Sequence, residues 1–83
     1  MKAIESVLRE IFIKRTGIDF LERTNLRTEL LFGETIGMPA RELVYVYFDI
    51  EANLHMTIPA QFIIDNRFDT YEHILECLQE LNS

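Results

Sequence analysis

The fold of this chain is decided by one stretch, residues 39–53, which reads PARELVYVYFDIEAN. Its centre, residues 43–48, is rich in β-branched and aromatic side chains, a composition that suits a buried strand as well as a helix. The flanks favour the helix, because apolar residues keep helical spacing at Leu43, Val46, Tyr47, Ile50 and Leu54. A lone strand would also lack an obvious partner in the sequence. We therefore predict a helix over residues 39 to about 53, with Pro39 at its first position.

Three other segments also have helical periodicity. Gly17 supplies a left-handed residue that ends the first helix, whose apolar stripe consists of Ile4, Val7, Leu8, Ile11 and Phe12. A short helix begins at Pro59 and ends before the turn-forming residues 65–66. The last helix is predicted from Asp69 to about residue 81, because Asp69 and Glu72 have the spacing of a helix cap and its reciprocal acid.

The segment between the first two helices, residues 17–38, has many apolar residues but no clean period. A loop of this length is unusual in a small domain. We expect it to pack across the helices, with a short helical turn near residues 19–23 or 28–32.

Length, charge and cysteine content limit the class of protein. The 83 residues allow one domain, residues 1–83, without room for a large catalytic cleft. Residues 39–83 hold eight acids and two bases, and hence the whole net charge of −6, which disfavours nucleic acid and attracts basic partners. The lone Cys77 and the lack of a signal-like or membrane-spanning run predict a cytoplasmic protein that does not act on membranes.

The order of these helices, with the long loop after the first, is similar to that of acyl carrier proteins. Ile58-Pro59 resembles the dipeptide that opens the third helix of that family, and Phe68-Asp69-Thr70 resembles the start of its last helix. Residues 37–43, GMPAREL, resemble the sequence of a small divergent branch of that family, the acyl-carrier-related proteins associated with bacterial peptide maturation systems. The resemblance implies an all-α fold, a four-helix bundle with a long loop between the first and second helices.

The resemblance also implies where a cofactor would be attached. A working carrier bears phosphopantetheine on the serine of an Asp-Ser-Leu motif at the start of its second helix. Counting back from Ile58-Pro59 without gaps places Ala40 at that serine, and alanine has no hydroxyl. We therefore expect no cofactor. Thr35 is a weaker alternative attachment site, and its reading as a loop or capping threonine is favoured.

One face of the helix over residues 39–53 is less polar than a surface helix requires. Either the loop of residues 17–38 covers this face, or its aromatic residues belong to a docking surface. Coverage by the loop is slightly favoured for Phe48, and docking is slightly favoured for Tyr45. The candidate partner-docking residues are Arg41, Glu42, Tyr45, Phe48, Asp49 and Glu51.

No set of residues in the sequence indicates catalysis or metal binding. His73 and Cys77 have a spacing at which two ligands can share a metal, but two are too few, and no orienting third group is evident. We therefore expect a non-enzymatic accessory or docking protein, and the resemblance to the peptide-maturation branch implies that it serves a bacterial peptide-modification system. Its partners would be modifying or acyl-transfer enzymes with basic surfaces. The alternative is a true acyl or peptidyl carrier with phosphopantetheine on Thr35.

Overall fold

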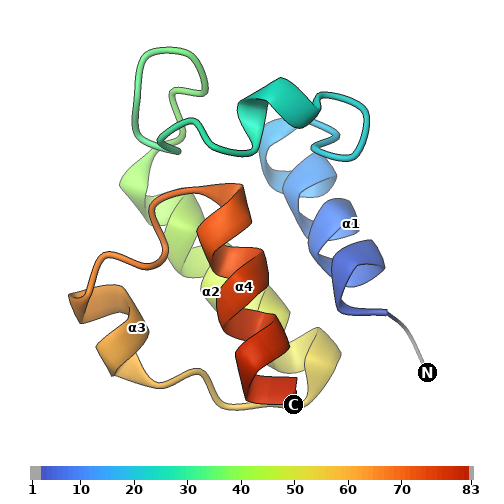
Figure 1. Ribbon diagram of the computed structural model, residues 1–83, viewed down its shortest axis with the longest axis vertical. Coiled ribbons are helices and arrows are strands. Elements are labelled where there is room, and N and C mark those ends of the chain that lie inside the picture. The colour runs from blue at the N-terminus through green and yellow to red at the C-terminus, as the bar shows by residue number, and fades with distance from the viewer. Residues whose placement is uncertain (1–2, 83) are drawn as a thin grey trace.

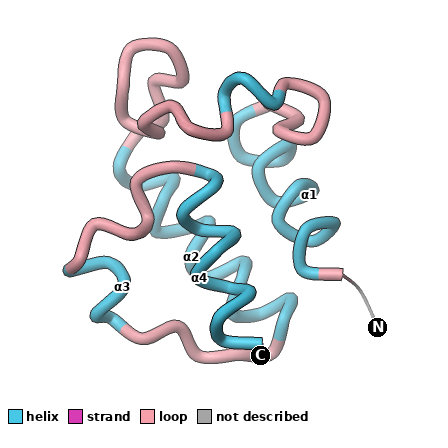
Figure 2. The backbone as a smooth tube through the Cα atoms, viewed as in Figure 1, coloured by secondary structure: helices cyan, strands magenta, loops and turns pink. Residues whose placement is uncertain are grey.

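The computed structural model describes residues 3–82, which form four α-helices and one short 3-10 helix without any strand (Figures 1 and 2). The α-helices are α1 (Ile4–Thr16), α2 (Ala40–Leu54), α3 (Ala60–Ile64) and α4 (Tyr71–Asn82), and the 3-10 helix is η1 (Thr24–Leu26). The predicted all-α fold is confirmed. Residues 43–48 are helical, so the choice of helix over strand for the deciding stretch is correct.

Helix α1 buries the predicted stripe and ends where expected. Val7, Leu8, Ile11 and Phe12 are all buried. Gly17 takes the left-handed conformation, with φ of 76°, and its N–H donates to the Ile13 carbonyl at 2.9 Å. A side chain at this φ would be strained, which explains why glycine ends the helix here.

Helix α2 follows the predicted stripe, although its first residue is Ala40 and not Pro39. Pro39 has an extended ψ of 145°, so it precedes the helix. Val46 and Ile50 are buried, and partly buried side chains flank them at Leu43, Tyr47 and Leu54.

Helix α4 begins two residues later than predicted. The Thr70 hydroxyl, and not the Asp69 carboxylate, accepts the His73 N–H at the start of the helix, at 3.0 Å. Thr70 directly precedes the first helical residue, so its hydroxyl reaches the third amide of the helix. Asp69 lies one residue further out, where its carboxylate contacts the His73 ring Nδ1 at 2.5 Å. The prediction of Asp69 as the cap was therefore wrong.

The loop of residues 17–38 packs across one end of the helices, as expected (Figure 1). Hydrogen bonds join it to the start of α4: Leu31 N–H donates to the Asp69 carbonyl at 2.8 Å, and Glu72 N–H to the Arg27 carbonyl at 3.0 Å. Residues 19–23 form one hydrogen-bonded turn, and η1 follows it, whereas residues 28–32 contain no helix. The buried side chains of the loop are Phe20, Leu26, Leu31 and Met38.

Three aromatic rings lock this loop to two helices. Phe20 from the loop stacks on Tyr71 of α4, with ring centroids 4.6 Å apart, and meets Phe12 of α1 edge-on at 5.3 Å. All three side chains are fully buried. The loop is therefore part of the hydrophobic core, and it is fixed in place beside the first turn of α2. No helix within residues 3–82 has the length and apolar character needed to cross a membrane.

Candidate docking face

The outer face of α2 is open to solvent. The exposed fraction is 57% for Phe48 and 46% for Tyr45. The prediction that the loop covers Phe48 was therefore wrong. Its hydrogen bonds to α4 and its buried aromatic residue hold the loop across the end of the helices, so it does not extend along α2 (Figure 1).

Phe48 belongs to an apolar groove between α2 and α3. We call it the α2–α3 groove. Its cavity of about 380 Å³ is lined by Phe32, Ala40, Leu43, Val44, Tyr47, Phe48, Ile63 and Phe68. Four of these side chains are exposed by 44–57%, namely Phe32, Val44, Phe48 and Ile63. Large apolar side chains thus gather at one exposed site, a pattern typical of interaction surfaces.

A second, smaller cavity extends this groove toward the start of α4. It has a volume of about 160 Å³ and shares Phe32, Leu43, Ile63 and Phe68 with the first. Its remaining lining residues, Asn66 and Asp69, are polar. The smaller cavity therefore adds two polar residues, one of them acidic, to the apolar lining of the groove.

The two residues considered for cofactor attachment occupy different places. Ala40 is the first residue of α2 and lines the α2–α3 groove. Thr35 is exposed in the turns before α2, within a loop that the Met38 N–H closes by donating to the Leu31 carbonyl at 2.8 Å. Only Thr35 has a hydroxyl, so only Thr35 could form a phosphodiester at this end of α2.

Three of the predicted docking residues point to α1 instead of the groove. The Arg15 guanidinium donates to Asp49 at 2.9 Å, lies 3.9 Å from the Glu42 carboxylate and sits 5.0 Å from the ring centroid of Tyr45. The hydrogen bond to Asp49 is the main cause of a raised pKa for Arg15. Glu42, Tyr45 and Asp49 therefore help to join α2 to α1, and about half of the Tyr45 side chain remains available to a partner.

Glu51 also has a structural contact. Its carboxylate accepts the Ile58 N–H at 2.8 Å, while the Tyr47 hydroxyl donates to the Ile58 carbonyl at 2.8 Å. Together they fasten the segment between α2 and α3, and burial raises the pKa of Tyr47. Arg41, by contrast, is exposed next to Ala40 at the start of α2. The predicted docking set is thus divided among four surroundings, and only Phe48 lines the groove.

Sequence reasoning missed three of the four exposed groove residues, namely Phe32, Val44 and Ile63. Phe32 lies in the long loop, whose path no local pattern predicts. For Ile63 a signal was present, because α3 is a five-residue helix, AQFII, with three large apolar residues. A helix of that length has too little surface to bury all three, and Ile63 and Ile64 are exposed by 44% and 68%.

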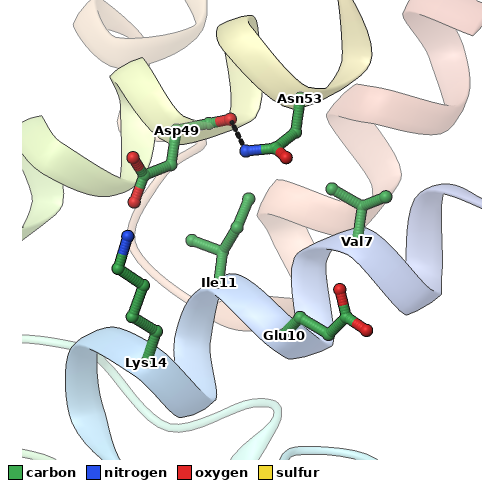
Figure 3. Close-up of a pocket in the computed structure, with 6 residues that line it drawn as sticks. All are labelled: Val7, Glu10, Ile11, Lys14, Asp49 and Asn53. Atoms are coloured by element: carbon green, nitrogen blue, oxygen red, sulfur yellow. Dashed lines mark hydrogen bonds between the residues drawn. The ribbon is translucent and has the colours of Figure 1, made fainter.

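A small pocket between α1 and α2 is shown in Figure 3. It has a volume of about 180 Å³, with Val7 and Ile11 on its apolar side. Lys14 and Asp49 point toward each other across it, and the Asn53 amide donates to the Asp49 carbonyl at 2.8 Å. Glu10 completes the lining. The residues that line this pocket include no serine, threonine, cysteine or histidine.

His73 and Cys77 do not form a site together. His73 is exposed and contacts Asp69, whereas Cys77 is buried. Burial raises the pKa of the Cys77 thiol, which favours its protonated form. Within residues 3–82, no three His, Cys, Asp or Glu side chains lie close enough together to hold a metal ion.

Scanned against protein-family models, curated proteins and solved structures, the chain matches none of them.

Proposed function

We propose that this protein is a non-enzymatic docking or accessory protein, similar to acyl carrier proteins, that binds a partner protein without carrying phosphopantetheine. The observation that supports docking is the α2–α3 groove, where four large apolar side chains stand exposed by 44–57% around a cavity of about 380 Å³. Covering apolar side chains of this size with another protein removes apolar surface from water, and this favours binding.

The relation to acyl carriers rests on sequence motifs and helix order. Ile58-Pro59 directly precedes α3, and the predicted sequence of long helix, long loop, central helix, short helix and final helix is present. In the family that this chain resembles, the surface that meets partners lies on the second helix and the loop before it. Here Phe48 and Val44 from α2 and Phe32 from the loop lie in that region.

The partners that we propose are enzymes with basic docking surfaces, of the kind that modify a ribosomal peptide or transfer an acyl group. Their basic character follows from the net charge of −6, which residues 39–83 supply. Opposite charge mainly accelerates association, whereas apolar anchors slow dissociation. A cytoplasmic location in a bacterium completes the proposal.

A second candidate function is an acyl or peptidyl carrier with phosphopantetheine on Thr35. It is favoured by the exposure of Thr35 on the loop before α2, where a transferase could reach its hydroxyl. The threonine hydroxyl is more hindered than that of serine, and aligning it with the family motif requires a gap. Attachment of the cofactor distinguishes this candidate from the docking protein.

The docking function is tested with the purified enzymes that neighbouring genes encode. Binding of each enzyme is measured to the wild type, to Phe48→Ala and to Ile13→Ala. Phe48→Ala is expected to weaken the binding of one enzyme by roughly ten- to hundred-fold, as loss of an aromatic anchor does. Ile13 is a matched control, because it is an exposed apolar residue, at 40%, on α1 and outside the groove. Equal binding by all three proteins would contradict docking at the groove.

A further inference from the structure

The walls of the α2–α3 groove indicate what kind of molecule fills it. A small ligand would occupy the cavity, but the outer surfaces of Phe32, Val44, Phe48 and Ile63 would stay in water. Small-molecule sites usually enclose most of their ligand. Here four lining side chains are exposed by 44% or more, so a ligand confined to the cavity would leave much of this apolar surface uncovered. A protein segment lying along the groove would fill the cavity and cover its rim together.

The charge of the chain indicates the charge of that segment. The smaller cavity is lined in part by Asp69, and within residues 39–83 acids outnumber bases by eight to two. A second copy of the chain would carry the same net charge of −6, and repulsion between like charges opposes self-association. A basic segment would be attracted instead.

Asp69 is an acidic residue that lines the smaller cavity of the groove. Its Oδ1 contacts the His73 ring at 2.5 Å. A carboxylate can accept hydrogen bonds at both oxygens, so Asp69 can also bind a cation. The cavity that Asp69 lines shares four apolar residues with the larger one.

We propose that the α2–α3 groove binds an amphipathic segment of another protein, with apolar side chains in the two cavities and a Lys or Arg beside Asp69. The larger cavity, beside Phe48, takes the bulkier side chain. This inference rests on the proposed docking function and specifies its partner chemistry. It needs no cofactor and no covalent step.

Selection from a displayed library of random peptides of about 16 residues tests this inference, since roughly four helical turns span a groove of this kind. Wild-type protein is the target, and peptides that also bind Phe48→Ala are removed. The selected peptides are expected to carry at least two large apolar residues at helical spacing and a net positive charge. Circular dichroism checks that Phe48→Ala stays helical, and Val44→Asp serves as a second groove variant.

The selected peptides are then measured individually against matched variants. Phe48→Ala and Val44→Asp are expected to weaken binding by about ten-fold or more, and Ile13→Ala to leave it unchanged. Asp69→Asn is expected to weaken the binding of basic peptides several-fold. Peptides whose Lys and Arg are replaced by Gln should bind Asp69→Asn and the wild type equally well. Failure to select any peptide, or selection of neutral or acidic ones, would overturn the inference.

Two further outcomes would show a different occupant. An uncharged apolar dye that binds the groove, and that no selected peptide displaces, would indicate a small-molecule site. A dimer in sedimentation equilibrium that Phe48→Ala dissociates would indicate a second copy of the chain. Either result overturns the proposal. The proposed function, in contrast, fails if phosphopantetheine becomes attached to the protein, an outcome that is independent of peptide binding.

Discussion

The Arg15 guanidinium donates to the Asp49 carboxylate at 2.9 Å and thereby joins the last turn of α1 to the middle of α2. The same guanidinium lies over the Tyr45 ring, 5.0 Å from its centroid. One basic residue thus orients α2 on α1 along the side next to Tyr45. The side of α2 that faces the groove, at Val44 and Phe48, remains open.

Removing either partner of this ion pair is expected to lower the urea midpoint of unfolding. Arg15→Gln and Asp49→Asn should each have this effect, and the double variant should be little worse than either one, because both remove the same contact. Added salt should reduce the difference from the wild type, since these side chains remain partly exposed to solvent. Effects that simply add in the double variant would show that the two residues act independently.

Adjacent leucines in the long loop provide a test of its role in the core. Leu31 is fully buried, whereas Leu30 is exposed by 56%. Leu31→Ala is expected to lower the free energy of unfolding by about 2–5 kcal/mol, as for other buried leucines. Leu30→Ala should change it by less than about 0.5 kcal/mol. Chemical denaturation measures both, and similar small losses would mean that the loop does not support the core.

Asp69 raises the pKa of His73 above its ordinary value, mainly through the hydrogen bond between the two side chains. Because the pKa is raised in the folded state, this contact stabilises the protein at pH values below the pKa of the unfolded chain. The contribution is lost as the pH rises through the higher, folded-state pKa. NMR titration of the His73 ring should show a lower pKa in Asp69→Asn than in the wild type. An unchanged pKa would rule out the contact as its cause.

The Tyr71 hydroxyl is buried and has no hydrogen-bond partner among residues 3–82. An unpaired buried hydroxyl opposes folding, so Tyr71→Phe is expected to raise the free energy of unfolding by about 1 kcal/mol at neutral pH. Loss of stability in this variant would show that the hydroxyl makes a contact important to the fold.

Burial also raises the pKa of Tyr71 to about 12. Because the folded state holds this proton more tightly than the unfolded state, the free energy of unfolding falls as the pH rises from the ordinary tyrosine pKa of about 10 toward 12. Denaturation over that range should therefore show a smaller decline in Tyr71→Phe than in the wild type. Equal declines would contradict the assignment.

Local sequence patterns predicted the helices well because each helix carries its own signal. Each of these signals lies within a short run of neighbouring residues: the apolar stripe of α1, the glycine at position 17, and the helical spacing of apolar residues around positions 43–48. The helix starts were less accurate. Pro39, Pro59 and Asp69 all proved to lie outside the helices, since only the backbone path decides which residue directly precedes the first turn.

The candidate site was less predictable because it depends on contacts between distant segments. Whether Phe48 is covered depends on the path of the long loop, and that path depends on Phe20 stacking against Tyr71, far away in the sequence. Likewise, a helical wheel places Tyr45 and Phe48 on one side of α2. In the structure, Arg15 from α1 lies over the Tyr45 ring, whereas Phe48 lines the groove. The groove needs residues from the loop, α2 and α3 together.

The mass of the intact protein, after incubation with coenzyme A and a phosphopantetheinyl transferase of broad specificity, tests the central claim most directly. A positive control is the triple variant Pro39→Asp, Ala40→Ser and Arg41→Leu, which restores the Asp-Ser-Leu motif at the first residue of α2. The wild type is predicted to keep its mass, because Ala40 has no hydroxyl, while the control gains one phosphopantetheine. A gain of that mass by the wild type, lost in Thr35→Val, would contradict the account and establish a carrier.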